Sequence, residues 1–203
     1  MNRISHVLFD LGNVLVTIHP DRFSATLGTD HAPDESRRSR VIHLIHRYEK
    51  GEIGSDIFFR NLGEIFEGRY SRAKLTEAME SVIGQAVTGM PELLRRVCLS
   101  VPVALVSNTN ETHFAYCRRE FDFLSLIPRF FLSWEMKTMK PAPEYYARVL
   151  DTVRSPAHTI VFIDDLPENV EGAQNAGMVG IVFEGAARLA NALRDLGVIH
   201  PAG

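Results

Sequence analysis

The sequence predicts an α/β fold, namely a doubly wound parallel sheet with a group of helices inserted after its first strand. Two observations predict it. From Pro91 onward, short apolar runs rich in β-branched residues alternate with helix-like segments, as is typical of right-handed βαβ crossovers. Between the first apolar run and Pro91, apolar residues instead recur with helical spacing.

The predicted strands are continuous apolar runs, which indicates strands that are buried on both faces. They lie at residues 7–9, 101–106, 159–163 and 179–183, with a weaker run at 130–132. Helices are expected at 91–98, 111–120, 143–154 and 167–176, so helix and strand alternate through this part of the chain.

The inserted segment contains three groups of apolar residues that each fall on one face of a helix. We expect Ser55 and Ser71 to cap the second and third of these helices, and we expect the insertion to span 17–87, with the sheet domain formed by 1–16 and 88–203. The groups are Val41, Ile42, Leu44, Ile45 and Tyr48; Phe58, Leu62, Ile65 and Phe66; and Leu75, Ala78, Met79, Val82 and Ile83.

Composition excludes several classes of protein. Of the 203 residues, 45% are apolar and 23% are charged, which is usual for a folded globular chain. The net charge of −3 offers no basic excess for nucleic acid or a membrane surface, and no apolar run is long enough to span a bilayer. Cys98 and Cys117 lack metal-binding or disulfide-framework spacing, so we expect a cytoplasmic protein.

Polar residues follow three of the predicted strands: Asp10, then Ser107 with Asn108, then Asp164 with Asp165. Each alone is also explained as a turn residue or helix cap. Together they predict a site, because ligands of open parallel sheets bind beyond the carboxyl ends of the strands. Clustered carboxylates would repel one another unless a hard cation such as Mg²⁺ joined them, and that cation would favour a phosphate ligand.

These segments, in order, resemble the motifs of the haloacid dehalogenase superfamily of phosphohydrolases. The matching residues are 9–15 (FDLGNVL), 106–110 (VSNTN), 139–141 (MKP) and 162–165 (FIDD). The resemblance covers nearly the whole chain, and it implies a Rossmann-like core with a C1-type helical cap. Within the insertion, the segment 48–53 (YEKGEI) is similar to one in phosphatases of the α-D-glucose-1-phosphate phosphatase group.

The resemblance implies a role for each matching residue. Asp10 would attack phosphorus and become an aspartyl phosphate. Ser107 and the backbone of Asn108 would hold phosphoryl oxygens, and Lys140 would neutralise the charge on the transferring group. Lys137 is a nearby alternative to Lys140, but no proline follows it.

The implied cofactor is Mg²⁺, held by Asp10, the carbonyl of Gly12 and Asp165. Asp164 is expected to orient waters or Lys140, although which of the adjacent pair binds the ion stays open. The sequence departs from the family at Gly12, where most of these phosphatases have a second aspartate that acts as general acid. Glycine cannot supply a proton, so leaving groups that need one should react slowly.

We therefore expect a Mg²⁺-dependent phosphatase that acts on a small phosphorylated metabolite, for which we favour a sugar phosphate and, among these, a sugar 1-phosphate. Two alternatives remain: a metal-independent hydrolase of the haloacid dehalogenase type, and a catalytically weak relative that binds a phosphorylated ligand. His19 and residues 48–52 are candidates for contacting the rest of the substrate. The oligomeric state is not predicted.

Overall fold

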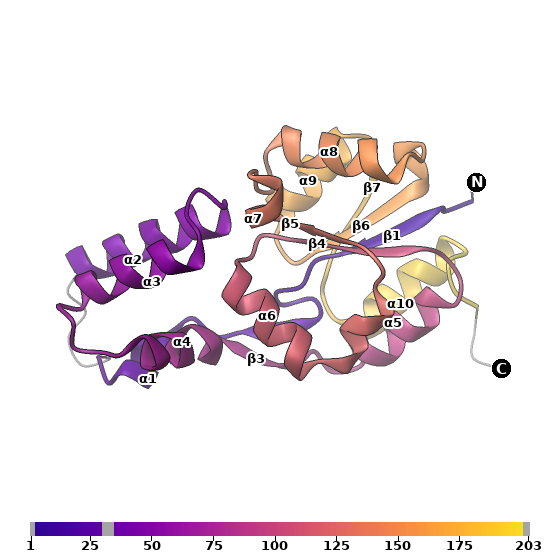
Figure 1. Ribbon diagram of the computed structural model, residues 1–203. Coiled ribbons are helices and arrows are strands. Elements are labelled where there is room, and N and C mark those ends of the chain that lie inside the picture. Colours follow the sequence, from indigo (N-terminus) through magenta and orange to yellow (C-terminus); the bar gives the residue numbers. More distant parts are fainter. Residues whose placement is uncertain (1–2, 30–34, 201–203) are drawn as a thin grey trace.

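The computed structural model describes residues 3–29 and 35–200 and confirms the predicted α/β class. A parallel sheet of strand order β5-β4-β1-β6-β7 forms its centre (Figure 1). The strands are β1 (His6–Phe9), β4 (Val103–Ser107), β5 (Phe130–Leu132), β6 (Ile160–Asp164) and β7 (Val179–Val182).

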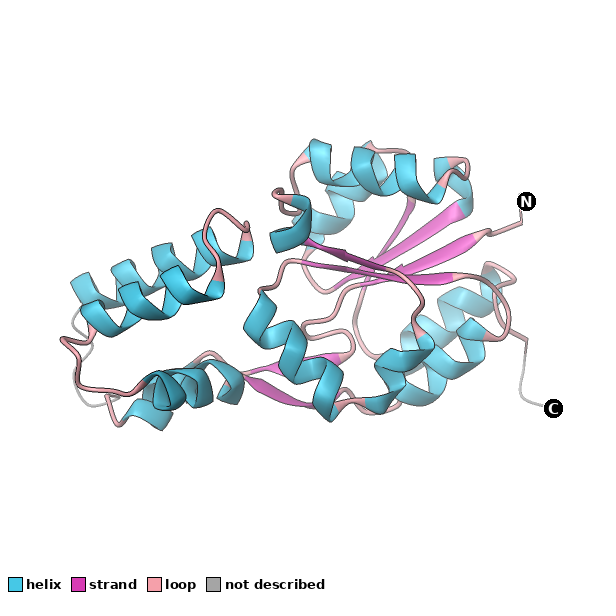
Figure 2. Ribbon diagram, in the orientation of Figure 1, coloured by secondary structure: helices cyan, strands magenta, loops and turns pink. Residues whose placement is uncertain are grey.

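Helices cover both faces of this sheet, as Figure 2 shows. One face packs against α5 (Met90–Cys98), α6 (Glu111–Glu120) and α10 (Ala186–Asp195), and the other against α8 (Pro143–Val153) and α9 (Pro167–Asn175). The connections include α7 (Ser133–Met136) and the 3₁₀ turns η1 (Asp122–Leu126) and η2 (Ala157–Thr159).

The two cores explain why the strand sequences are continuously apolar. In β1, Val7 and Phe9 are buried in the core beneath α5, whereas Leu8 is buried in the core beneath α8. Successive side chains of a strand point to opposite faces, so consecutive residues such as Val7, Leu8 and Phe9 are all buried and all apolar.

The inserted helices form a separate group with a core of its own. They are α1 (Asp21–Leu27), α2 (Glu35–Glu49), α3 (Ser55–Ile65) and α4 (Arg72–Ser81), and Phe58, Leu62 and Met79 lie fully buried among them. The chain enters and leaves this group through β2 (Val16–Ile18) and β3 (Ile83–Ala86), an antiparallel pair that the sequence did not predict. We propose 17–87 as the cap and 1–16 with 88–203 as the core.

Two expectations for the cap helices need correction. Helix α3 begins one residue earlier than expected, with Gly54 as its N-cap; Ser55 lies inside the helix and its hydroxyl contacts Tyr48 and Glu111 instead. Ile42 belongs to the predicted apolar face of α2 but is 56% exposed, because that part of the helix lines a cavity rather than the cap core. The predicted cap at Ser71 is confirmed, since its side chain accepts a hydrogen bond from the Lys74 amide.

None of the described helices is long and apolar enough to cross a lipid bilayer. Cys98 and Cys117 are both free thiols. The cytoplasmic location inferred from the cysteines stays a prediction.

Candidate active site

Three strand ends bring the predicted polar residues together at the carboxyl edge of the sheet. In β1, Phe9 pairs with Leu105 of β4 on one side and with Ile163 of β6 on the other. Because neighbouring parallel strands are in this register, Asp10 follows β1 beside the ends of β4 and β6. Those ends are Ser107 and Asp164.

Lys140 joins two of the carboxylates. Its Nζ atom donates to Asp10 Oδ1 at 2.8 Å and to Asp164 Oδ2 at 2.6 Å, and also to the carbonyl of Val106 at 3.0 Å. The side chain of Lys140 is 1% exposed. Lys137, the alternative lysine, donates instead to the carbonyl of Gly51 in the cap, so it belongs to the boundary between cap and core.

Burial and charge oppose each other at this buried cluster. Burial is the largest influence on Lys140 and favours the neutral amine, but the charges of Asp10 and Asp164 outweigh it and raise the pKa of the ammonium. Burial raises the pKa of Asp10 to about 6, against the lowering effect of the Lys140 charge, and the charge of Asp164 adds to the rise. One ammonium thus lies between two carboxylates that both need a positive partner.

Asp165 adds a third carboxylate to the cluster. Oxygen atoms of Asp10, Asp164 and Asp165 all lie within 4.8 Å of one another. Three carboxylates against one ammonium leave an excess of negative charge, and oxygen-rich sites of this kind suit hard divalent cations. The residues therefore fit a bound Mg²⁺ ion.

The two adjacent aspartates differ in their surroundings. Both oxygens of Asp164 accept hydrogen bonds from the protein: Oδ1 from the Leu166 amide at 3.0 Å and Asn169 Nδ2 at 2.9 Å, and Oδ2 from Lys140. Asp164 is fully buried, whereas Asp165 is half-buried and lines the cavity. Asp165 is thus the more accessible of the pair.

Asn13 is a site residue that the sequence interpretation missed. Its Nδ2 atom donates to Asp165 Oδ2 at 3.1 Å, and its Oδ1 atom accepts from the Ile18 amide at 3.1 Å. Its φ of 54° lies in the left-handed region, which asparagine tolerates better than most residues. An asparagine directly after Gly12 was the available signal, because that pair is typical of a turn.

Asn108 holds the lysine segment in place through its side chain. Its Nδ2 atom donates to the Lys140 carbonyl at 2.8 Å, and its Oδ1 atom accepts from the Lys140 amide at 2.9 Å. Ser107 lies beside it, is 2% exposed, and lines the same cavity. The end of β4 therefore positions Lys140 as well as facing the cavity.

The position of Gly12 leaves little room for a side chain. A Cβ atom added there would lie 3.2 Å from Cγ1 of Ile18 and 4.0 Å from Oδ2 of Asp10. The contact with Ile18 is tight enough that its side chain would have to move by a few tenths of an ångström, whereas the distance to Asp10 is an ordinary van der Waals contact. The side chain of Ile18 thus occupies part of the space that an aspartate side chain at position 12 would need.

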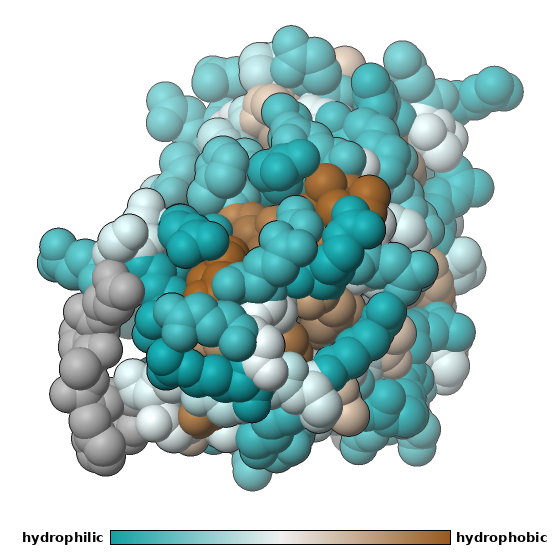
Figure 3. Space-filling view, turned by 60° about the vertical axis from the view of Figure 1, so that its left-hand side comes forward, coloured by the Kyte–Doolittle hydropathy of each residue, from teal (hydrophilic) through white to brown (hydrophobic). Residues whose placement is uncertain are grey.

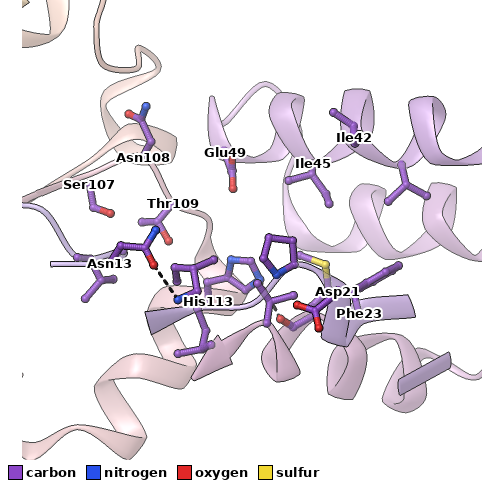
Figure 4. Close-up of a pocket in the computed structure, with 18 of the residues that line it drawn as sticks. Asn13, Asp21, Phe23, Ile42, Ile45, Glu49, Ser107, Asn108, Thr109 and His113 are labelled. Carbon is purple, nitrogen blue, oxygen red and sulfur yellow. Dashed lines mark hydrogen bonds between the residues drawn. The ribbon is translucent and has the colours of Figure 1, made fainter. Parts of the chain in front are cut away.

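A cavity of about 780 Å³ extends from these residues into the cap. In Figure 4, Ser107, Asn108 and Thr109 lie at its core end, while Ile42, Ile45 and Glu49 of α2 lie at its cap end. Of the predicted substrate-contacting residues, Glu49 lines the cavity. His19 lies outside the described cavity wall, with Nε2 at 3.0 Å from Thr17 Oγ1.

Glu49 and His113 carry titratable groups in the cavity wall. Burial raises the pKa of Glu49 to about 7, although a hydrogen bond with the Asn110 side chain lowers it. Burial lowers the pKa of His113 to about 4. Neutral His113 donates from Nε2 to the Met79 carbonyl at 2.9 Å, and its Nδ1 lies 3.1 Å from Asn110 Nδ2. Asn110 therefore ties cap and core together.

The fold and the site together define a class, that of capped α/β enzymes with an acidic centre at the carboxyl edge of a parallel sheet. The chain belongs to the haloacid dehalogenase-like hydrolase family, which it matches over residues 4–177. The predicted family is therefore confirmed.

Three curated proteins are similar to this chain in sequence. Flavin mononucleotide hydrolase 1 of Arabidopsis thaliana is 32% identical over 163 residues, which are 74% of this chain and 61% of that protein's length. D-ribitol-5-phosphate phosphatase of Bacteroides thetaiotaomicron is 23% identical over 86% of this chain and 89% of its own. Sesquiterpene phosphatase astK of Aspergillus oryzae is 26% identical over 93% of this chain and 94% of its own.

Solved structures show the same fold. HAD family enzyme BT-2542 from Bacteroides thetaiotaomicron superimposes with a TM-score of 0.86 at 24% identity and covers 95% of this chain and 100% of its own. A complex of that enzyme with magnesium and inorganic phosphate covers 90% of this chain and 95% of its own, with a TM-score of 0.82 at 24% identity.

Proposed function

We propose that this hydrolase is a Mg²⁺-dependent phosphatase that releases phosphate from a small phosphorylated metabolite through an aspartyl-phosphate intermediate. The observation that carries the proposal is the buried contact of Lys140 with Asp10 and Asp164, with Asp165 beside them, at the end of a large cavity. Two of the relatives are named phosphatases, and a third is named a hydrolase of flavin mononucleotide.

Asp10 is the nucleophile in this proposal. It follows β1 in the chain and lines the cavity, and its carboxylate is held by Lys140. A phosphate bound at this end of the cavity would lie beside it. Attack on phosphorus forms the aspartyl phosphate and expels the alcohol, and water then attacks the same phosphorus to release phosphate and restore Asp10. Lys140 and Ser107 stabilise the phosphoryl oxygens, whose charge changes during transfer.

Asp10, the Gly12 carbonyl and Asp165 are the direct Mg²⁺ ligands in this proposal, and Asp164 orients Lys140. When bound, the ion withdraws charge from phosphoryl oxygens and lessens repulsion between phosphate and carboxylates. Asn13 positions Asp165 through its hydrogen bond, and Asn169 does the same for Asp164.

A screen of phosphorylated metabolites and 4-nitrophenyl phosphate tests the function, with free phosphate measured in the presence and absence of Mg²⁺. We expect release that depends on the ion. Halide release from 2-haloacids that persists in EDTA, without phosphatase activity, would support the dehalogenase alternative. Phosphate-ester binding without turnover would support the non-catalytic one.

Replacing Asp165 by alanine should raise the Mg²⁺ concentration needed for half-maximal activity more than replacing Asp164 does. A direct ligand contributes more to affinity than an orienting residue, whose loss typically costs about 10- to 100-fold. Titration of activity with Mg²⁺ measures both variants. Because Asp164 is fully buried, thermal unfolding must show that its variant is folded. A larger effect at Asp164 would reverse the two assignments.

Gly12 predicts that the reaction rate depends steeply on the acidity of the leaving group. With no acid at this position, the departing oxygen must carry more of its own negative charge. Aryl phosphates and sugar 1-phosphates should therefore have higher kcat/KM than sugar 6-phosphates or glycerol phosphate, which is the chemical reason for favouring a 1-phosphate among sugar phosphates. A series of substituted aryl phosphates of similar size measures the dependence on leaving-group pKa.

A flat dependence would contradict the argument from Gly12. It would indicate that another group supplies the proton, and Glu49 is a cap carboxyl in the same cavity. The matched variant Glu49→Gln would then restore a steep dependence.

A further inference from the structure

The cavity has two chemically different ends. Near the sheet it is lined by the charged and polar residues of the site, including Asp10, Ser107 and Lys140. Toward the cap its wall is mostly apolar, formed by Ile18, Phe23, Val41, Ile42, Ile45 and Phe66. These side chains come from β2, the helices α1 and α2, and the residue that follows α3, so distant parts of the cap share one apolar surface.

The view from the cap side shows the same contrast. In Figure 3, hydrophobic surface lies in the middle of this face and hydrophilic residues surround it. Ile42 is 56% exposed although it lines the cavity. Covering apolar surface in a cavity with an apolar group of a ligand removes that surface from water, which favours binding.

The polar groups of the cap end offer little to a sugar. Glu49 and His113 already contact Asn110, and His113 also donates to a backbone carbonyl. Arg37 lies near Glu67 and over the ring of Phe66. Asp21 and Arg38 are exposed residues of the wall. Thr29, which also lines the cavity, donates from its hydroxyl to the carbonyl of Ser24. The hydroxyl groups of a sugar bound here would lose their hydrogen bonds to water and would contact apolar side chains that cannot replace those bonds, which costs free energy.

We propose that the preferred substrate is a phosphate ester with an apolar body, such as a long hydrocarbon chain, which lies against Ile42 and Ile45 of the cap while its phosphate lies at Asp10. This proposal rests on the proposed function, because the phosphate position fixes where the body must go. The volume of about 780 Å³ is in the range of cavities that enclose small-molecule ligands.

A homologous series of primary alkyl phosphates tests the proposal, from ethyl to dodecyl phosphate, each below its micelle-forming concentration. Leaving-group acidity hardly changes along this series, so the effect of Gly12 is held constant. The measurement is the inhibition constant of each ester against hydrolysis of 4-nitrophenyl phosphate. We expect the constant to fall about fourfold for each added CH₂ group until the cavity is filled.

A pair of isoleucine variants locates the apolar contact. Ile42→Gln should weaken inhibition by dodecyl phosphate by roughly fivefold, because it removes apolar contact area, and should leave inhibition by ethyl phosphate unchanged. Ile57→Gln is the matched control. Ile57 is a 41% exposed isoleucine of α3 outside the described cavity wall, so its variant should bind dodecyl phosphate normally.

The outcomes separate the inference from the proposed function. If 4-nitrophenyl phosphate is hydrolysed but chain length has no effect, the inference of an apolar substrate is wrong, whereas the proposed phosphatase function is retained. The same holds if a sugar 1-phosphate binds more tightly than dodecyl phosphate. Inhibition by dodecanol equal to that by dodecyl phosphate would also overturn it, because the phosphate would then not anchor the ligand. If no phosphate ester is hydrolysed, the proposed function fails, and the inference fails with it.

Discussion

Replacing Asp10 by asparagine is expected to abolish phosphate release while leaving the fold intact. The substitution removes the nucleophilic oxygen and a proposed metal ligand, but it keeps nearly the same volume and a carbonyl oxygen that can accept from Lys140. It also removes one of two carboxylates near each other in a buried cluster, so stability should not fall greatly. Loss of a covalent nucleophile costs roughly 10⁴-fold or more in kcat.

The measurement is phosphate release from 4-nitrophenyl phosphate at saturating Mg²⁺, compared between folded samples of equal concentration. Circular dichroism and thermal unfolding provide the control for structure. Turnover near that of the unchanged protein, in a variant that unfolds at a normal temperature, would remove the covalent mechanism from consideration.

Replacing Lys140 by alanine should lower kcat by about 10² to 10³-fold even at saturating Mg²⁺. A fixed ammonium 2.8 Å from the Asp10 carboxylate aligns the nucleophile and stabilises charge that changes in the transition state. Added Mg²⁺ cannot replace it, since Lys140 also holds Asp164 and the Val106 carbonyl.

The same variant should be less stable, because the buried carboxylates of Asp10 and Asp164 lose their shared partner. Removing one member of a buried ion pair typically costs about 3 to 5 kcal/mol. Lys140→Met, which fills more of the vacated volume, separates a folding defect from a catalytic one: it should be more stable than the alanine variant and equally inactive. Lys137→Ala is the matched control and should keep kcat. The reverse pattern at these lysines would show that the motif alignment is wrong.

Most strands of the sheet could be predicted because a strand buried on both faces is recognised from a short run of consecutive apolar residues. The strand at residues 160–164 is apolar at each position before Asp164, and a two-sided core requires that pattern. The polar ends of the strands could be predicted for the same reason, since Asp10 and Asp164 interrupt runs that are otherwise apolar. Their convergence then follows from parallel pairing.

The contacts across the chain could not be derived from local pattern. Lys140 lies 130 positions from Asp10 along the chain, and only resemblance to a family indicated that the two would meet. The pair β2 and β3 was missed because each strand is short and is only partly buried. Ile42 shows a related limit: helical spacing identifies an apolar face, but the same spacing fits a core and a ligand cavity.

The most direct test of the central claim is to trap the phosphorylated enzyme. The protein is mixed with an aryl phosphate and Mg²⁺, quenched in acid within the first turnover, digested and examined by mass spectrometry, with the Asp10→Asn variant as control. We predict one added phosphoryl group on the peptide that contains Asp10, which hydroxylamine removes and which the variant lacks. Rapid phosphate release in the first turnover with no phosphoryl group on Asp10, or with the group on another residue, would contradict the account.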